Sequence, residues 1–222
     1  MLVNQIAAIR ESVFLVLRIR QAVAPMVELR PEGTAFYIGN GYFLTADHLF
    51  DNPPLDQSDV IQVVSVSKTT QYAVSIDYRT PTHDLAILKL GTPNGALGAL
   101  SLSVGIEPDG RSVFSYGFLS PRIDNNIPGR PTLVAAPRAT SSIIGARVPF
   151  FGNRYELDGQ TYPGESGAPV FRTSDHVVIG VVQATRSVDV QAPINKTRGP
   201  TIASPLDVIQ AELTARGIAP VI

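Results

Sequence analysis

The feature that most restricts the fold of this chain is a succession of short runs rich in β-branched and aromatic residues, separated by Gly, Pro, Asn and Asp. Such runs favour strands, and the separating residues favour tight turns because of their backbone preferences. The predicted strands are residues 13–19, 26–29, 35–38, 42–45, 61–66, 72–78, 85–90, 112–118, 132–137, 141–148, 154–157, 168–171, 177–183 and 200–203. Many short strands joined by turns are typical of an antiparallel barrel or sandwich, so the sequence predicts an all-β fold.

The strands fall into two groups. Residues 91–110 are poor in strand-forming residues and rich in Pro, Asn and Gly, which indicates a connection between two β-rich halves. Ser204 as N-cap, Pro205 at the first helical position and Gly217 as a stop signal predict a C-terminal helix. The predicted units are a helical extension (1–11), an N-terminal barrel (12–100), a C-terminal barrel (101–203), and a helix with a tail (204–222).

Composition excludes several kinds of chemistry. The 222 residues contain no cysteine, which excludes disulfide scaffolds, iron–sulfur clusters and thiol catalysis. The net charge is −1, from 18 basic and 19 acidic residues, whereas a dedicated nucleic-acid-binding protein usually has a basic excess. We therefore expect no nucleic-acid partner.

No apolar run reaches the 18 residues of a membrane span, so none is expected. Arg10 and Glu11 interrupt the region where the apolar part of a secretory signal would begin. The sequence predicts a cytoplasmic protein, or one from which a targeting peptide has been removed, and we favour the cytoplasm.

Three local motifs carry residues suited to nucleophilic catalysis, which needs a presented hydroxyl, a base and an acid that orients the base. GESGAP, at residues 164–169, surrounds Ser166 with glycines that allow a sharp turn. GYFLTADH, at residues 41–48, is a strand that ends at His48. HDLAILKL, at residues 83–90, places Asp84 at the mouth of an apolar strand. Each motif alone also fits an ordinary turn or surface residue, but together they offer all three groups.

In the order His48, Asp84 and Ser166, these motifs resemble those of the trypsin/chymotrypsin family of serine peptidases, particularly its bacterial branches without disulfides. The matching patterns are TAxH, DLAIL and GxSGxP, and the resemblance covers roughly residues 12–216. It implies two six-stranded antiparallel β-barrels with the active site in the cleft between them. Residues 91–110 would then cross from one barrel to the other.

The resemblance implies a role for each of these residues in hydrolysing peptide bonds of an extended polypeptide substrate through an acyl-enzyme. Ser166 would be the nucleophile, His48 the general base and then acid, and Asp84 the group that orients the imidazole. The backbone N–H groups of Gly164 and Ser166 would form the oxyanion hole. No cofactor and no metal is expected.

Substrate contacts are expected at two places. Gln183, Ala184 and Thr185 match the strand whose backbone pairs with an extended substrate by β-augmentation. Gln160, six residues before the nucleophile, replaces the acid on which tryptic specificity rests, so we expect a small or apolar side chain to be accepted.

Two positions depart from the family pattern. Gln183 stands where a Ser or Thr hydroxyl often binds the catalytic acid, so either its amide takes this role or Thr185 does. Glu165 has no obvious partner and is expected to face solvent, as most glutamates do. No activation junction is present in the sequence, so we expect the protein to fold directly to its active form.

Two functions therefore remain open. The first is an active serine endopeptidase. The alternative is a protease-like module with a weak or unused triad that binds peptide or protein partners. Both functions are compatible with a chain that is part of a longer polypeptide or of a complex.

Overall fold

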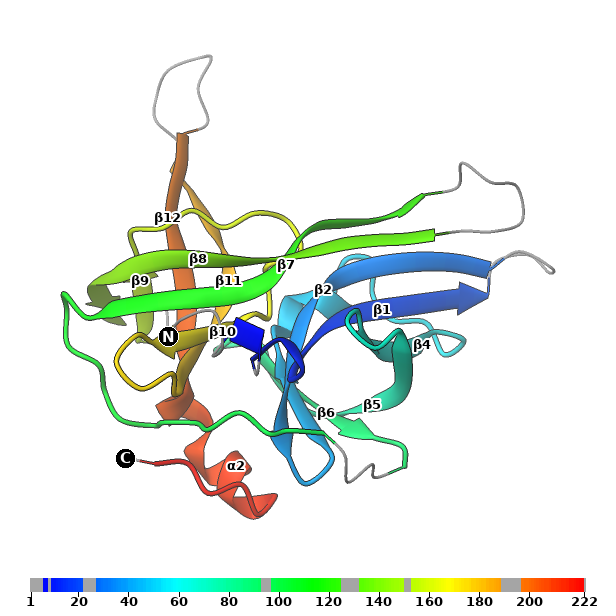
Figure 1. Cartoon of the computed structure of the whole chain (residues 1–222), viewed down its shortest axis with the longest axis horizontal. Coiled ribbons are helices and arrows are strands. Elements are labelled where there is room, and N and C mark those ends of the chain that lie inside the picture. The colour runs from blue at the N-terminus through cyan, green and yellow to red at the C-terminus, as the bar shows by residue number, and fades with distance from the viewer. Residues whose placement is uncertain are drawn as a thin grey trace.

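Two closed antiparallel barrels of six strands each form the molecule (Figure 1). The computed structural model describes residues 6–7, 9–21, 27–92, 97–124, 132–149, 153–188 and 197–221. The first barrel, in the order β1-β2-β3-β6-β5-β4, contains β1 (Val13–Gln21), β2 (Val27–Gly39), β3 (Tyr42–Thr45), β4 (Val60–Ser65), β5 (Thr70–Thr80) and β6 (Leu85–Leu90). The second, in the order β10-β11-β12-β9-β8-β7, contains β7 (Ser112–Asp124), β8 (Thr132–Val148), β9 (Arg154–Leu157), β10 (Pro169–Arg172), β11 (Val178–Val188) and β12 (Thr197–Pro205). The predicted all-β, two-barrel fold is confirmed.

Strand β6 is buried on both faces, because one face packs inside the first barrel and the other packs against the cluster formed with the second barrel. Its side chains alternate, so that Leu85 and Ile87 join a cluster containing residues of both barrels, whereas Ala86 and Leu88 fill the first barrel. A strand buried on both faces is read as a continuous apolar run, which is what the sequence has here.

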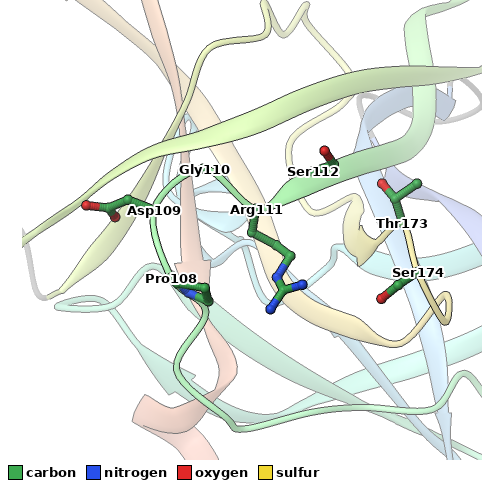
Figure 2. Close-up of a pocket in the computed structure, with 7 residues that line it drawn as sticks. All are labelled: Pro108, Asp109, Gly110, Arg111, Ser112, Thr173 and Ser174. Carbon is green, nitrogen blue, oxygen red and sulfur yellow. The ribbon is translucent and has the colours of Figure 1, made fainter.

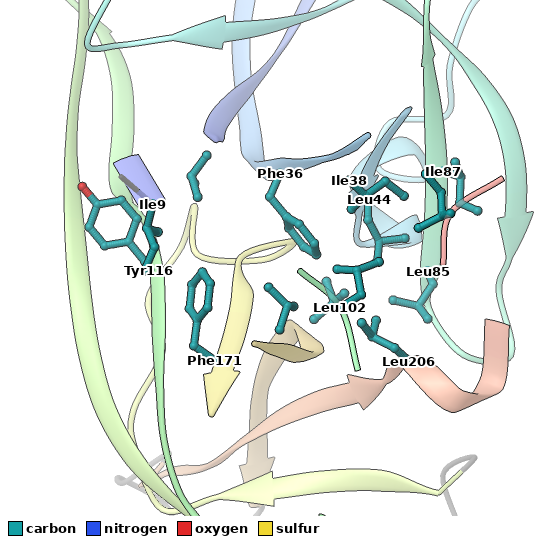
Figure 3. Close-up of a cluster of buried hydrophobic side chains, with 14 of the residues drawn as sticks. Ile9, Phe36, Ile38, Leu44, Leu85, Ile87, Leu102, Tyr116, Phe171 and Leu206 are labelled. Carbon is teal, nitrogen blue, oxygen red and sulfur yellow. The ribbon is translucent and has the colours of Figure 1, made fainter. Parts of the chain in front are cut away.

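The largest apolar cluster lies between the barrels and fixes how they pack (Figure 3). Phe36 and Leu44 of the first barrel and Phe171 of the second belong to it. Leu206, from the C-terminal segment, closes it. Full burial of each such side chain contributes about 1.5–3 kcal/mol, so together they hold the two barrels in one relative position.

Two pairs of predicted strands are single strands in the structure. Residues 26–29 and 35–38 belong to β2, apart from Met26, which lies outside the described residues, and residues 132–137 and 141–148 both belong to β8. The intervening polar residues did not end either strand, because pairing with β1 and β7 continues through them. The two long hairpins, β1–β2 and β7–β8, extend alongside each other (Figure 1).

The C-terminal helix begins later than predicted. Ser204 was expected to be its N-cap, but Ser204 lies in β12 and pairs with Val181. A 3₁₀ turn, η3 (Leu206–Ile209), follows and leads into α2 (Gln210–Ala215), with Gly217 in a left-handed conformation just beyond it. Of the predicted N-terminal extension, residues 1–5 and 8 lie outside the described residues. Within the described part of the chain, no helix is long and apolar enough to cross a membrane.

Candidate active site

His48 and Asp84 meet because their strands are neighbours in the first barrel. His48 lies in the 3₁₀ turn η1 (Asp47–Phe50), just after β3, and Asp84 immediately precedes β6. β3 and β6 pair antiparallel, with Thr45 opposite Ala86. The end of one strand and the start of the other therefore share one edge of the barrel, 36 residues apart in sequence.

Two hydrogen bonds join this pair. The Nδ1 atom of His48 lies 2.8 Å from Oδ2 of Asp84, and the backbone N–H of His48 donates to Oδ1 at 2.8 Å. The carboxylate thus fixes both the ring and the main chain of the histidine. With Nδ1 engaged by the acid, Nε2 is the nitrogen left to exchange a proton with another group. The imidazole side chain is 41% exposed and the carboxylate 15% exposed, so a reactant has access to the base while the acid is largely covered.

Arginines hold the turn that carries His48. Arg79 of β5 bonds to the carboxylates of Asp47 (2.5 Å) and Asp51 (2.6 Å), on either side of the histidine. These carboxylates raise the pKa of Arg79. The buried Arg18 donates to the carbonyl of Leu49 at 2.9 Å. The turn is therefore tied to two strands of its own barrel and is a rigid platform for the imidazole.

Ser166 precedes β10 in the second barrel, and its hydroxyl donates to the carbonyl oxygen of Gln183 at 2.6 Å. A hydroxyl has one proton, so in this arrangement Ser166 does not donate to His48. Among the three predicted residues, the structure therefore pairs His48 with Asp84, while Ser166 is in a rotamer directed at β11.

Thr34 of β2, which the sequence analysis did not single out, ties residues 164–167 to the first barrel. We call this segment the serine loop because it carries Ser166. The N–H of Thr34 donates to the carbonyl of Ser166 at 2.8 Å, and the Thr34 hydroxyl donates to the carbonyl of Gly164 at 2.7 Å. Gly167 has φ +85°, and a Cβ there would overlap the Thr34 carbonyl. The glycine after the serine is thus required by the close approach of the two barrels.

The N–H of Gly164, one of the two predicted oxyanion-hole donors, is oriented by the peptide group that joins it to Pro163. The carbonyl of Pro163 accepts the N–H of Ser120 at 2.7 Å, on the β7 side of the loop. In a trans peptide the following N–H points the opposite way, so the N–H of Gly164 points away from β7. Neither this N–H nor that of Ser166 donates to another described backbone carbonyl outside the strand ladders.

Glu165 does not face solvent as expected: it is 1% exposed. Its carboxylate accepts the N–H of Tyr162 at 2.7 Å and the hydroxyl of Thr140 at 3.3 Å. Burial raises the pKa of Glu165, although the N–H of Tyr162 and the charge of Arg138 act in the opposite direction. Glutamate usually prefers solvent, but here two segments, the one before the serine and β8, each supply a hydrogen-bond donor to the buried carboxylate.

The predicted substrate-contact residues lie on β11 and on the segment before the serine. Gln160 is exposed, whereas its neighbour Thr161 is buried and lies 3.4 Å, oxygen to oxygen, from the hydroxyl of Thr201. The backbone of Ala184 and Thr185 pairs with β12 on one side only among the described strands. No described strand pairs with the other edge of this part of β11.

The Gln183 side chain binds the backbone before Asp84, whereas the side chain of Thr185, the other residue considered for the contact with the acid, lies outside the described part of the structure. The Nε2 atom of Gln183 donates to the carbonyl of His83 at 2.6 Å, on the backbone that leads into Asp84. The amide therefore reaches the main chain of the turn that carries the acid, on the first barrel.

A pocket of about 560 Å³ lies elsewhere, between the start of β7 and the turn after β10 (Figure 2). It is lined by Pro108, Asp109, Gly110, Arg111, Ser112, Thr173 and Ser174, none of which belongs to the predicted site. Arg111 forms an ion pair with the buried Glu107.

Among the described residues, no group of three or more His, Asp or Glu side chains is arranged to hold a metal ion.

Comparison with known proteins gives one finding. The model of the trypsin-like peptidase domain matches residues 33–181, well over half of the chain and including all three predicted catalytic residues. No curated protein matches the sequence significantly.

Proposed function

Because the chain belongs to the trypsin-like peptidase family, we propose that it is a serine endopeptidase that uses Ser166, His48 and Asp84. The observation that carries the proposal is the pair of hydrogen bonds between His48 and Asp84, which leaves Nε2 of the histidine to act as a base. The serine loop is tied to the same barrel through Thr34, which supports a fixed spacing between nucleophile and base.

In the proposed reaction, the Ser166 hydroxyl first turns from the Gln183 carbonyl to His48, a change between staggered rotamers. Its oxygen attacks the scissile carbonyl carbon while Nε2 takes the proton, and Asp84 stabilises the resulting imidazolium. The N–H groups of Gly164 and Ser166 donate to the developing oxyanion. The imidazolium then protonates the leaving amine, and an acyl-enzyme remains. Water, deprotonated by His48, then attacks the ester carbonyl; the bond to the Ser166 oxygen breaks, the carboxylic acid leaves, and the imidazolium returns its proton to Ser166.

We further propose that the substrate binds as an added strand on β11. The open edge at Ala184 and Thr185 supplies backbone donors and acceptors that do not depend on the substrate sequence. The side chain before the scissile bond would lie beside Gln160 and the buried Thr161. Neither group is charged, which favours a small, uncharged side chain over Arg or Lys.

Covalent labelling tests the catalytic proposal. A fluorophosphonate probe is expected to label the native protein at Ser166, and peptide mapping locates the adduct. Ser166→Ala and heat-unfolded protein serve as controls and should not react. Asp84→Asn should fold but label more slowly by about 10⁴-fold, the loss known for this substitution in the family's reaction. An unlabelled native protein with an intact fold would reject the proposal.

A second function is favoured by one observation, the bond from the Ser166 hydroxyl to the Gln183 carbonyl, which directs the nucleophile away from the base. If this rotamer persists with peptide bound, the protein would act as a peptide-binding module. That function predicts peptide binding unchanged by Ser166→Ala, together with turnover no faster than that of the variant.

A further inference from the structure

Three side chains from the second barrel bind consecutive backbone carbonyls of the first. These carbonyls belong to residues 82–84, which we call the acid turn because it ends in Asp84. Arg154 of β9 donates to the carbonyl of Thr82 at 3.2 Å. Gln183 of β11 donates to that of His83 at 2.6 Å and lies 3.5 Å from that of Asp84. Ser204 of β12 also donates to the His83 carbonyl.

The contacts made by Gln183 and Ser204 are buried and connected, whereas that of Arg154 lies at the surface. Gln183 and Ser204 are each 1% exposed, and the Gln183 amide also donates to the Ser204 hydroxyl. A buried carbonyl without a donor costs about 1–3 kcal/mol, so Gln183 and Ser204 are the partners that replace water at the His83 carbonyl. The His83 carbonyl accepts both of these donors, and its position is therefore set from the second barrel.

The backbone conformation of Asp84 explains why the position of the His83 carbonyl affects the site. Asp84 has φ +52°, in the left-handed region that a non-glycine residue adopts only where its surroundings impose it. Its carboxylate must simultaneously meet both the Nδ1 atom and the N–H of His48. A small rotation of the acid turn would break one of these two bonds.

We infer that Arg154, Gln183 and Ser204 are positioning residues, which hold the acid turn so that Asp84 orients His48 for catalysis. Gln183 thus contacts both parts of the site, because its side-chain amide holds the acid turn and its backbone carbonyl accepts the Ser166 hydroxyl in the resting rotamer. The inference rests on the proposed peptidase function.

The test uses substitutions that remove one donor each. Ser204→Ala removes a hydroxyl, Gln183→Met removes the amide while keeping its length and the backbone carbonyl, and Arg154→Met removes the guanidinium. Arg154→Lys and Ser204→Thr keep a donor and are the conservative variants. Ser12→Ala is the matched control, because Ser12 is also buried (3% exposed) and its hydroxyl donates to a backbone carbonyl, that of Gly98 at 2.6 Å, away from the acid turn.

Two readouts separate positioning from stability. The first is the NMR signal of the His48 Nδ1 proton, which is expected to shift or broaden in the three donor-removing variants and to stay unchanged in Ser12→Ala. The second is peptide hydrolysis, in which kcat should fall about 10- to 100-fold with KM changed less than about threefold, because misplacement by about 1 Å costs that much in rate. The conservative variants should recover most of both.

An unchanged His48 signal in all three folded donor-removing variants, with losses of thermal stability like that of Ser12→Ala, would overturn the inference. If one variant fails to fold, the other two still decide. The NMR readout does not require activity, so it distinguishes this inference from the peptidase proposal, which fails on its own if native protein resists the fluorophosphonate.

Discussion

Replacing Gly167 by alanine gives a direct measure of how closely the serine loop approaches the first barrel. Gly167 has φ +85°, and an added Cβ would lie closer than 3.0 Å to the Thr34 carbonyl and to the Thr45 hydroxyl. The Thr34 carbonyl has little room to yield, because the Thr45 hydroxyl donates to it at 2.6 Å. Something in the barrel contact must therefore move.

The magnitude follows from two separable costs. A left-handed conformation costs an alanine about 1–2 kcal/mol relative to glycine, and overpacking adds about 1–3 kcal/mol. Gly110 provides the matched control, since it has φ +80° but no atom within 4 Å of the position that a Cβ would take. We expect Gly110→Ala to lose about 1–2 kcal/mol of unfolding free energy and Gly167→Ala about 2–5 kcal/mol.

Urea denaturation measures both losses, and the fluorophosphonate labelling rate measures the effect on Ser166. Displacement of Thr34 would loosen the N–H bond to the Ser166 carbonyl, so labelling of Gly167→Ala should slow at least about tenfold, with Gly110→Ala near wild type. Equal unfolding free energies and equal labelling rates for the two variants would refute the argument from close approach.

Two further predictions concern buried charges. Arg18→Met should lower the unfolding free energy by about 3–5 kcal/mol in urea, because the largely buried carboxylate of Glu32 loses its nearer cation, 2.8 Å away, and keeps only the exposed Arg30 at 3.4 Å; the added substitution Glu32→Gln should restore much of this, and a further loss would contradict the pairing. Glu165→Gln tests the sign of a pH dependence. Burial raises the pKa of Glu165 above its ordinary 4.5, so its contribution to stability is fully present below pH 4.5 and is lost as the pH rises through the raised value. Between about pH 4 and pH 7 the urea midpoint of the wild type should therefore fall relative to that of Glu165→Gln, whereas parallel curves would show that Glu165 titrates normally.

The parts of the site that the sequence predicts are those that depend on residues close together in the chain. The turn after 42–45 and the start of 85–90 place His48 and Asp84 at strand ends, and neighbouring antiparallel strands bring such ends together. The all-β fold was likewise predictable, because strand-forming runs and turn residues recur along the whole chain, whereas the two six-stranded barrels were implied by the family resemblance.

The parts that the sequence does not predict depend on contacts between distant segments. Thr34 and Gly164 are 130 residues apart, and no local pattern marks a threonine hydroxyl for that carbonyl. Ser204 before Pro205 has the local pattern of a helix N-cap, yet strand pairing with β11 and the bond to His83 decide its position. Local propensity was overridden wherever a buried carbonyl in the other barrel required a donor.

The contacts on the acid turn also bear on the order in which the molecule matures during synthesis. His48 and Asp84 both precede β7, but Ser204, one of the three donors to the acid turn, lies in β12, the last strand to emerge. A nascent chain that has completed only its first barrel would carry the imidazole and the carboxylate without the donors that fix their alignment. Even after Ser166 has been synthesised, this geometry would be completed only when β12 joins the second barrel, so reactivity toward neighbouring polypeptides would wait for that strand.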